Sequence, residues 1–405
     1  MWIIDVEASI NRMYASFRLK RATLNYVEAP YFTSEGGTGK QARRTRKRKR
    51  RELRDGKATS QTLPLVLEQL PLKLQELDQL RQAIVGQERN LKGGEEGNTT
   101  RTDEGTAGIE KRRDGAEDDA GKLLREWAHS SKSEASLTSK VEQEVLHANV
   151  LVHNEVERLA QGPPGFKAIL PKQSSYLLGD LLGENCEATY RQLASYGPYN
   201  LITMDPPWHN RSVSRSRQYE TSPTSHMVAI PIKELSAESC HLLIWVTNDP
   251  DVIEQAMALI SGWGFQLKAR WHWLKCTTGG EFVTPLTSQH KKPYELLLVA
   301  CKGEGQENIQ SSNGCSRAKG FASTPLRHSW KPPLEDLLPL LLAKGAPSVA
   351  KELGEEARPG GSGELHGLQL GKKLELFARE VRTGWVCCGD EVLKFQRDIY
   401  WDQRK

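Results

Sequence analysis

The chain has 405 residues, of which 38% are hydrophobic and 26% are charged. At roughly 150 residues per domain, this length predicts two or three structural units and one core of substantial size. No uninterrupted apolar run is long enough to cross a membrane, so we expect no membrane partner. The seven cysteines form no C-x-x-C pair, which predicts a reducing compartment and no bound zinc or other metal.

The net charge of +5, from 56 Lys and Arg against 51 Asp and Glu, does not by itself indicate a nucleic-acid partner. Its distribution is more informative, because residues 43–51 read RRTRKRKRR. Such a run must stay solvated, either as a flexible solubilising arm or as a segment for nuclear import or phosphate binding. We expect the protein in the nucleus, with the cytoplasm as a second location.

Residues 1–86 form the first predicted region. Scattered aliphatic and aromatic residues within residues 1–40 indicate a short folded element of uncertain type. After the basic run, apolar residues recur with helical spacing between Leu74 and Ile84, which predicts a packing helix. We therefore expect a mainly helical or partly disordered N-terminal region.

Two further regions precede the main domain. Residues 87–138 are dominated by Gly, Glu, Asp, Arg and Thr, which predicts a disordered linker because little apolar surface can be buried. We expect one amphipathic helix over residues 139–164 that packs on the following domain through an apolar stripe of Val141, Val145, Ala148, Val152, Val156 and Leu159. Ser139 and Glu142 form its capping signature, and a Gly-Pro-Pro-Gly turn ends it.

Residues 165–405 are predicted to form an α/β domain. Short apolar runs alternate with helical stretches and turns, which is typical of a sheet with mostly buried strands. The expected strands cover residues 201–204, 241–247, 267–274, 294–301 and 373–378, and the expected helices cover residues 251–260 and 333–342.

The strongest local motif is Asp205-Pro206-Pro207-Trp208, directly after the predicted strand 201–204. In an open α/β sheet, ligands bind beyond the carboxyl ends of the strands. Two consecutive prolines fix the backbone and remove two N–H donors, which leaves carbonyls and a carboxylate as acceptors. Such a corner suits an exocyclic amino group such as adenine N6, with Trp208 as a face for the base. The plainer alternative is a strand that ends in a rigid turn with a buried aromatic residue.

The motif does not stand alone. Asp205-Pro206-Pro207-Trp208 at a strand end resembles the signature of the MT-A70-like adenine N6-methyltransferases, and further segments resemble the branch called methyltransferase-like protein 4. These segments are residues 212–219, 273–282, 290–295, 328–333, 373–379, 384–385 and 391–396. Their order and approximate spacing match throughout residues 165–400.

This resemblance implies a Rossmann-like sheet and S-adenosyl-L-methionine as the methyl donor. It also implies a catalytic role for the four residues Asp205, Pro206, Pro207 and Trp208. The residues that it implies for cofactor binding are Asp180, Lys331, Arg379, Glu380, Gly389, Asp390 and Glu391.

Two of these positions depart from the family pattern. Arg379-Glu380 stands where the family typically has Arg-Asn, and Gly389-Asp390 stands where it has Gly-Asn. Each change replaces an amide, which donates and accepts, by a carboxylate that only accepts. The departures put the strength of cofactor binding in question.

The resemblance also implies a substrate surface. Residues 210–219 are similar to the family's substrate-gating loop, and a basic loop there suits a phosphate backbone. Its candidate contacts are Asn210, Arg215 and Tyr219. A second group consists of His290, Lys291 and Lys292, with Glu295 reading or positioning the base. A flexible solvated turn is the alternative for both segments.

Three functions remain open at this point. The first is N6-adenine methylation of RNA, and the branch resemblance suggests a 2′-O-methyladenosine of U2-type small nuclear RNA. The second is the same chemistry on DNA, where flipping a paired base costs a few kcal/mol. The third is a catalytically inactive nucleic-acid-binding partner. For catalysis we expect a monomer.

Overall fold

The computed structural model describes residues 2–24, 115–130, 145–208, 224–278, 280–284, 292–303, 319–339 and 371–404. The basic run and the helix predicted between Leu74 and Ile84 lie outside these residues, and the helix predicted at residues 333–342 lies partly outside them.

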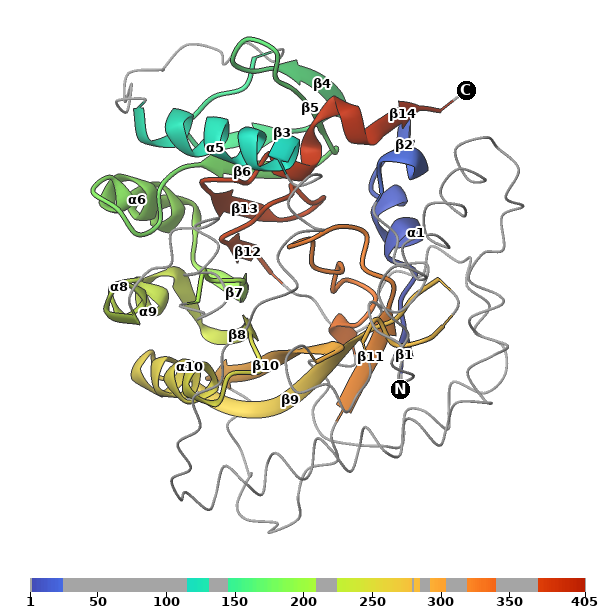
Figure 1. The fold of residues 1–405 in the computed structure, drawn as a ribbon. Coiled ribbons are helices and arrows are strands. Elements are labelled where there is room, and N and C mark those ends of the chain that lie inside the picture. Colours follow the sequence, from blue (N-terminus) through green and yellow to red (C-terminus); the bar gives the residue numbers. More distant parts are fainter. Residues whose placement is uncertain are drawn as a thin grey trace, which may run out of the picture.

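A ten-stranded mixed sheet forms the centre of the described residues (Figure 1). Its strands, in spatial order, are β1 (Trp2–Ile3), β11 (Lys319–Ser323), β9 (Gln266–Lys275), β10 (Tyr294–Lys302), β8 (Ser236–Val246), β7 (Tyr199–Met204), β12 (Lys373–Leu376), β13 (Val386–Gly389), β6 (Ser174–Leu178) and β3 (Val152–Asn154). The five strands from β8 to β6 run parallel to one another, whereas β10 is antiparallel to both of its neighbours. The sheet therefore has one edge where five parallel strands end together.

Both faces of this sheet are buried. Along β7, Leu201 belongs to one hydrophobic cluster, while Ile202 and Met204 belong to the other. This split follows from the two-residue period of a strand, which sends successive side chains to opposite faces. Because both faces are covered, the strands read as nearly continuous apolar runs, as expected for parallel strands.

The helices α6 (Cys186–Tyr196), α8 (Thr224–Val228), α9 (Ile232–Leu235) and α10 (Pro250–Gly262) cover one face. Figure 1 shows them stacked along one side of the sheet. The start of α10 is set by its sequence, because Asp249 accepts a hydrogen bond from the backbone of Asp251 and Pro250 occupies the first turn. An acidic cap and an early proline are both favoured at a helix start.

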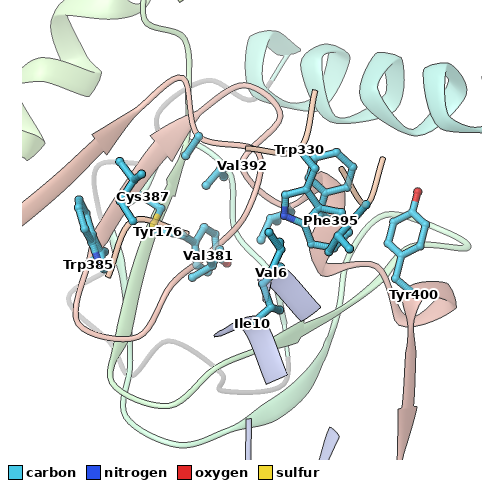
Figure 2. Packing of buried hydrophobic residues seen from close by; sticks show 14 of the residues in the cluster. Val6, Ile10, Tyr176, Trp330, Val381, Trp385, Cys387, Val392, Phe395 and Tyr400 are labelled. Atoms are coloured by element: carbon cyan, nitrogen blue, oxygen red, sulfur yellow. The ribbon is translucent and has the colours of Figure 1, made fainter. Parts of the chain in front are cut away.

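The opposite face carries an aromatic-rich core. Trp330 stacks on Phe395 there, with Tyr400 nearby (Figure 2). The N-terminal helix α1 (Val6–Asn11) contributes Val6 and Ile10 to the same cluster. This N-terminal segment is therefore part of the domain core.

Smaller elements tie the ends of the chain to this core. The strand β2 (Phe17–Leu19) pairs with β14 (Trp401–Gln403), and β4 (Arg158–Gln161) pairs with β5 (Lys167–Leu170). Three short 3-10 helices complete the described elements: η1 (Arg21–Thr23), η3 (Lys394–Gln396) and η4 (Asp398–Tyr400).

The predicted α/β class is confirmed, and so are the five strands that sequence analysis placed. They correspond to β7, β8, β9, β10 and β12, and the helix predicted at residues 251–260 is α10. The sheet begins earlier than the predicted boundary at residue 165, because β3 pairs with β6 and β1 pairs with β11.

The amphipathic helix predicted for residues 139–164 is wrong over its described part. From residue 145 onward the chain forms isolated bridges and the strands β3 and β4. Three positions of the expected buried stripe are exposed, Val145 at 37%, Val156 at 56% and Leu159 at 40%. The repeated valines, which are β-branched and pack well on a pleated surface, explain why pairing prevails over helix formation.

The disordered linker predicted for residues 87–138 contains a helix, α5 (Gly115–Ser130). Leu124 and Ala128 are fully buried and lie on one face of it. The side chain of Asn149 also donates a hydrogen bond to the Ala128 carbonyl. The apolar residues near the end of the polar stretch are sufficient to dock this helix on the domain.

Candidate active site

The carboxyl ends of the parallel strands bring several predicted site residues together. Asp205 follows β7, Arg379 follows β12 by a short turn, Asp390 follows β13 and Asp180 follows β6 closely. These strands are neighbours and run in one direction, so their ends lie along one edge of the sheet. This is the edge at which ligands bind in open α/β sheets.

Strand β10 contributes a residue from its beginning, whereas the parallel strands contribute residues from their carboxyl ends. It runs antiparallel to β8, so its beginning lies at the same edge, and Glu295 is its second residue. Lys275 is the last residue of the neighbouring strand β9. The edge thus gathers charged groups from strands of both directions.

Asp205 is held by two cations. Its Oδ2 atom lies 2.8 Å from Nη1 of Arg379 and 3.0 Å from Nζ of Lys331. All three side chains are largely buried, with 15–17% of each exposed. Within the described part of the chain, the hydrogen bonds and ion pairs of Asp205 all involve Oδ2, and Oδ1 has no described partner.

Glu295 extends this arrangement. Its Oε2 atom lies 3.0 Å from Nζ of Lys331, and its Oε1 atom pairs with Lys275. Burial alone would raise the pKa of Glu295, but Lys275 and Lys331 outweigh that effect and lower it. Burial would lower the pKa of Lys331, but Asp205 and Glu295 raise it. We call Asp205, Glu295, Lys331, Arg379 and Lys275 the Asp205 cluster; its carboxylates and cations pair with one another.

A second carboxylate fixes the other side of Arg379. Oε2 of Glu391 lies 3.2 Å from Nε of Arg379 and 3.0 Å from Nζ of Lys394, and Oε1 pairs with Arg125 of α5. Burial would raise the pKa of Glu391, but Lys394, Arg379 and Arg125 lower it. Arg379 therefore bridges two carboxylates, Asp205 and Glu391.

Trp208 anchors the turn that carries Asp205. Its indole nitrogen donates to the carbonyl of Trp245 over 2.7 Å, and its backbone N–H donates to the Pro206 carbonyl over 2.8 Å. The side chain is 7% exposed and packs in the aliphatic core. This placement differs from the open stacking face expected from sequence, because the indole N–H finds an acceptor inside the sheet. The Pro206 carbonyl keeps a second lone pair for a ligand.

Asp180 and Asp390 lie at the neighbouring strand ends. Oδ1 of Asp180 accepts hydrogen bonds from the backbone of Leu182 and Gly183, and its Oδ2 lies 3.8 Å from Nε2 of His129 on α5. Burial, together with the adjacent Glu391, raises the pKa of Asp390.

Gly389 allows two turns to approach each other. A side-chain carbon at this position would lie 2.9 Å from the carbonyl oxygen of Ala378, too close for any other residue. The contact brings the end of β13 against the turn that carries Arg379. The backbone of this turn is unusual, since Phe377 has a φ of 58°.

Glu380 is placed differently from the cofactor-binding position that we expected. It is 5% exposed, and both of its oxygens bond within the protein. Oε2 accepts from the indole of Trp330 over 2.6 Å, and Oε1 accepts from Nε of Arg382 over 2.7 Å. The carboxylate that replaces the family's amide is therefore compensated by a buried arginine.

Arg382 is surrounded by carboxylates. Besides its contact with Glu380, its Nε atom lies 3.4 Å from Oε2 of Glu375, and its Nη1 atom lies 3.9 Å from Oε1 of Glu335. We call these four residues the Arg382 cluster. Burial raises the pKa of Glu375 to about 8, against the effect of Arg382 and with that of Glu380 and Glu335. Burial also raises the pKa of Glu380, although Arg382 opposes it.

Part of the predicted substrate surface is not described. Asn210, Arg215, Tyr219, His290 and Lys291 lie outside the described residues. Lys292 is described and half-buried.

Sequence reasoning missed several residues of the site. Lys275 directly follows a predicted strand, and this place in the sequence could have predicted that it lies at an end of the sheet. Lys394 falls within a segment that resembles the family. Arg125 carried no signal beyond the helical spacing of its apolar neighbours, because its partner Glu391 is distant in sequence.

The described residues contain no group of three or more His, Cys, Asp and Glu side chains arranged to hold a metal ion. Among the helices that the structure describes, none has the length and apolar character to span a bilayer.

Comparison with known proteins agrees with this geometry. The MT-A70 family model matches residues 199–350. Human N(6)-adenine-specific methyltransferase METTL4 is 32% identical over 286 residues, which cover 69% of this chain and 54% of the relative. N6-methyladenosine RNA methyltransferase MTA1 of Cryphonectria parasitica is 32% identical, over 60% of this chain and 65% of that protein. A DNA N6-methyl methyltransferase of Caenorhabditis elegans is 26% identical, over 66% and 64%.

The matched region of the METTL4 relative amounts to about half of its length. The family model includes β7, the Asp205-Pro206-Pro207-Trp208 turn, Glu295 and Lys331, whereas Asp180, Arg379 and Asp390 lie outside the matched residues. This chain belongs to the MT-A70 family and is METTL4-like.

Proposed function

We propose that this chain is an S-adenosyl-L-methionine-dependent N6-adenine methyltransferase that acts on nucleic acid. The observation that carries the proposal is the state of Asp205 at the end of β7. Two cations hold its Oδ2 atom, and its Oδ1 atom has no described partner. Together with the Pro206 carbonyl, this makes a rigid corner of acceptors that suits the two N–H groups of an exocyclic amine.

The donor set at the strand ends fits the methyl donor. Lys331 and Arg379 are cations suited to its carboxylate, and Lys331 uses two of its three N–H donors in its described ion pairs. Asp180 and Asp390 are acceptors suited to ribose hydroxyls. When bound, S-adenosyl-L-methionine supplies an electrophilic methyl group.

The residues of the chain act by positioning. Accepting both amino protons at Asp205 Oδ1 and the Pro206 carbonyl draws the nitrogen lone pair out of conjugation with the ring. Holding that nitrogen about 3 to 3.5 Å from the reacting carbon supplies a large part of the rate enhancement. Lys331 and Arg379 keep the carboxylate of Asp205 in a fixed position, and the amine's proton leaves to solvent.

We propose RNA as the substrate, with a 2′-O-methyladenosine of U2-type small nuclear RNA as the specific target, and DNA as the second candidate. The relatives support both, since the similar proteins include an RNA methyltransferase and a DNA methyltransferase. The test is incubation with isotope-labelled S-adenosyl-L-methionine and separate RNA and DNA pools, followed by mass spectrometry of nucleosides. Label is expected from RNA in an N6-methylated adenosine, which for the specific target is N6,2′-O-dimethyladenosine. Label only in deoxyadenosine contradicts the RNA assignment, and label in neither pool contradicts the proposed function.

The basic run supports a further part of the proposal, nuclear localisation. Deletion of residues 43–51 is expected to reduce nuclear entry of a fluorescent fusion or the affinity for nucleic acid. If neither changes, the run is only a solubilising arm. We also propose that catalysis requires one copy of the chain, and a specific activity that is independent of protein concentration is the expected result.

A further inference from the structure

We propose that the buried hydrogen bond between Trp330 and Glu380 is a clamp that positions the two cations on Asp205. Trp330 directly precedes Lys331, and Glu380 directly follows Arg379. The indole nitrogen donates to Oε2 of Glu380 over 2.6 Å, and the two side chains are only 3% and 5% exposed. One bond therefore joins the two loops at the positions next to the cations. The inference rests on the proposed function of Asp205.

The indole ring is fixed independently of its nitrogen. It stacks on Phe395 with ring centroids 4.2 Å apart and an interplanar angle of 1° (Figure 2). Phe395 directly follows Lys394. The Nζ atom of Lys394 lies 3.0 Å from Oε2 of Glu391, and the same oxygen lies 3.2 Å from Nε of Arg379. The ring stack and the clamp thus reach Arg379 by two separate routes.

Glu380 is held from its other side by Arg382. Nε of Arg382 donates to Oε1 over 2.7 Å, and this arginine is 2% exposed. A carboxylate between an indole and a guanidinium can satisfy both donors, one with each oxygen. An amide cannot, because only one of its two terminal atoms accepts. The clamp is therefore built for Glu at this position.

The backbone before Lys331 needs such a constraint. Ser329 has a φ of 62°, a left-handed conformation that a residue with a side chain rarely adopts. Strained positions persist only when their surroundings over-determine them. Loss of the clamp is expected to let this segment relax, which moves Lys331 away from Asp205 and Glu295.

Trp330→Phe tests the clamp because phenylalanine keeps an aromatic ring on Phe395 and removes the N–H donor. Trp401→Phe is the matched control. It removes another buried indole donor from the same core, one that bonds the Phe395 carbonyl over 3.2 Å and has no described bond to a residue of the Asp205 cluster. Both variants are expected to lower the melting temperature by similar amounts. Only Trp330→Phe is expected to lower kcat, about tenfold, with little change in the KM for nucleic acid.

The double variant Trp330→Phe with Glu380→Gln separates positioning from general destabilisation. Both substitutions remove the Trp330–Glu380 bond, and Glu380→Gln also weakens the pair with Arg382, so the double variant is expected to lose less kcat than the product of the two single losses. Equal loss of kcat in Trp330→Phe and Trp401→Phe would overturn the proposal, as would losses that multiply in the double variant. If Trp330→Phe does not fold, Glu380→Gln is compared with Trp401→Phe in the same way.

The outcome is distinguishable from failure of the proposed function. If the wild-type chain methylates neither RNA nor DNA, the proposed function fails and the clamp is tested by calorimetric titration with S-adenosylhomocysteine. The affinity is then expected to fall in Trp330→Phe and to stay unchanged in Trp401→Phe. An unchanged affinity in both variants overturns the clamp as well.

Discussion

The Asp205 cluster and the Arg382 cluster are two buried groups of charges connected through the chain at Arg379 and Glu380. In the Asp205 cluster, Asp205 and Glu295 each contact two cations, and the pKa of Glu295 is lowered. In the Arg382 cluster, three carboxylates surround one guanidinium, and the pKa of Glu375 is raised to about 8.

Both clusters are removed from water, so burial does not distinguish them. They differ in the number of cations available to each carboxylate. A paired buried carboxylate stays ionised, whereas one in excess of cations takes up a proton. The Asp205 cluster is therefore suited to hold a polar ligand at neutral pH. The Arg382 cluster supports the loops that carry Lys331 and Arg379.

The largest expected effect comes from Asp205. Asp205→Ala removes the acceptor that would orient the amine, and we expect methyl transfer to fall about 100-fold or more, comparable to the loss of a preorganised polar group in other enzymes. Labelled-methyl incorporation measures this, and Asp205→Asn repeats it with a side chain of equal size. Asp249→Ala, which removes only the cap of α10, is the control and should keep its kcat. Residual activity above about a tenth contradicts the orienting role.

Lys331→Ala breaks the Asp205 cluster at the ammonium that joins two carboxylates. We expect the dissociation constant for S-adenosyl-L-methionine to rise about tenfold, equivalent to about 1.4 kcal/mol. Isothermal titration calorimetry measures it. Lys302→Ala is the matched lysine control, since Lys302 lies at the end of β10 that is remote from Glu295. A dissociation constant unchanged in both variants removes Lys331 from the cofactor site.

Part of this site could be predicted from the sequence. The buried strand before Asp205 and the acceptor-only turn are local features, and Lys331 and Arg379 come from segments that resemble the family. The pairing of Lys331 with Glu295 could not be predicted, because it depends on the antiparallel placement of β10 beside β8. Residues 145–164 were misassigned because a valine stripe can suit a helix or a strand, and long-range pairing with β5 and β6 decides between them.

Glu295→Gln tests the charge pairing of the Asp205 cluster through the stability of the protein at acidic pH. The folded-state pKa of Glu295 is lowered, so the ionised carboxylate contributes stability above its unfolded pKa of about 4.5, and this contribution is lost as the pH falls below that value. At pH 7 the variant should lose about 2 kcal/mol of unfolding free energy, since Lys275 and Lys331 lose one charge partner. Chemical denaturation at several pH values measures this. A wild-type profile that matches the variant's between pH 3 and pH 7, within about half a kcal/mol, contradicts the pairing.

For Glu375 we expect the opposite pH dependence of the unfolding free energy, and Glu375→Gln tests it. The folded-state pKa of about 8 lies above the unfolded value, so the contribution of protonated Glu375 is fully present below about pH 4.5 and is lost as the pH rises through 8. The wild type should lose roughly 1 to 3 kcal/mol between pH 5 and pH 9, and the variant should lose less. Denaturation midpoints across that range measure it. Equal slopes for the two proteins would show that Glu375 is ionised in the folded state.

The most direct measurement is a crystal structure of the chain with S-adenosylhomocysteine and an adenosine-containing oligonucleotide. We predict that the adenine amino nitrogen lies about 3 Å from Oδ1 of Asp205. We also predict that Oδ2 remains bound to Lys331 and Arg379. An adenine bound elsewhere, or an Asp205 whose Oδ1 is closed off by protein in the complex, would contradict the central claim.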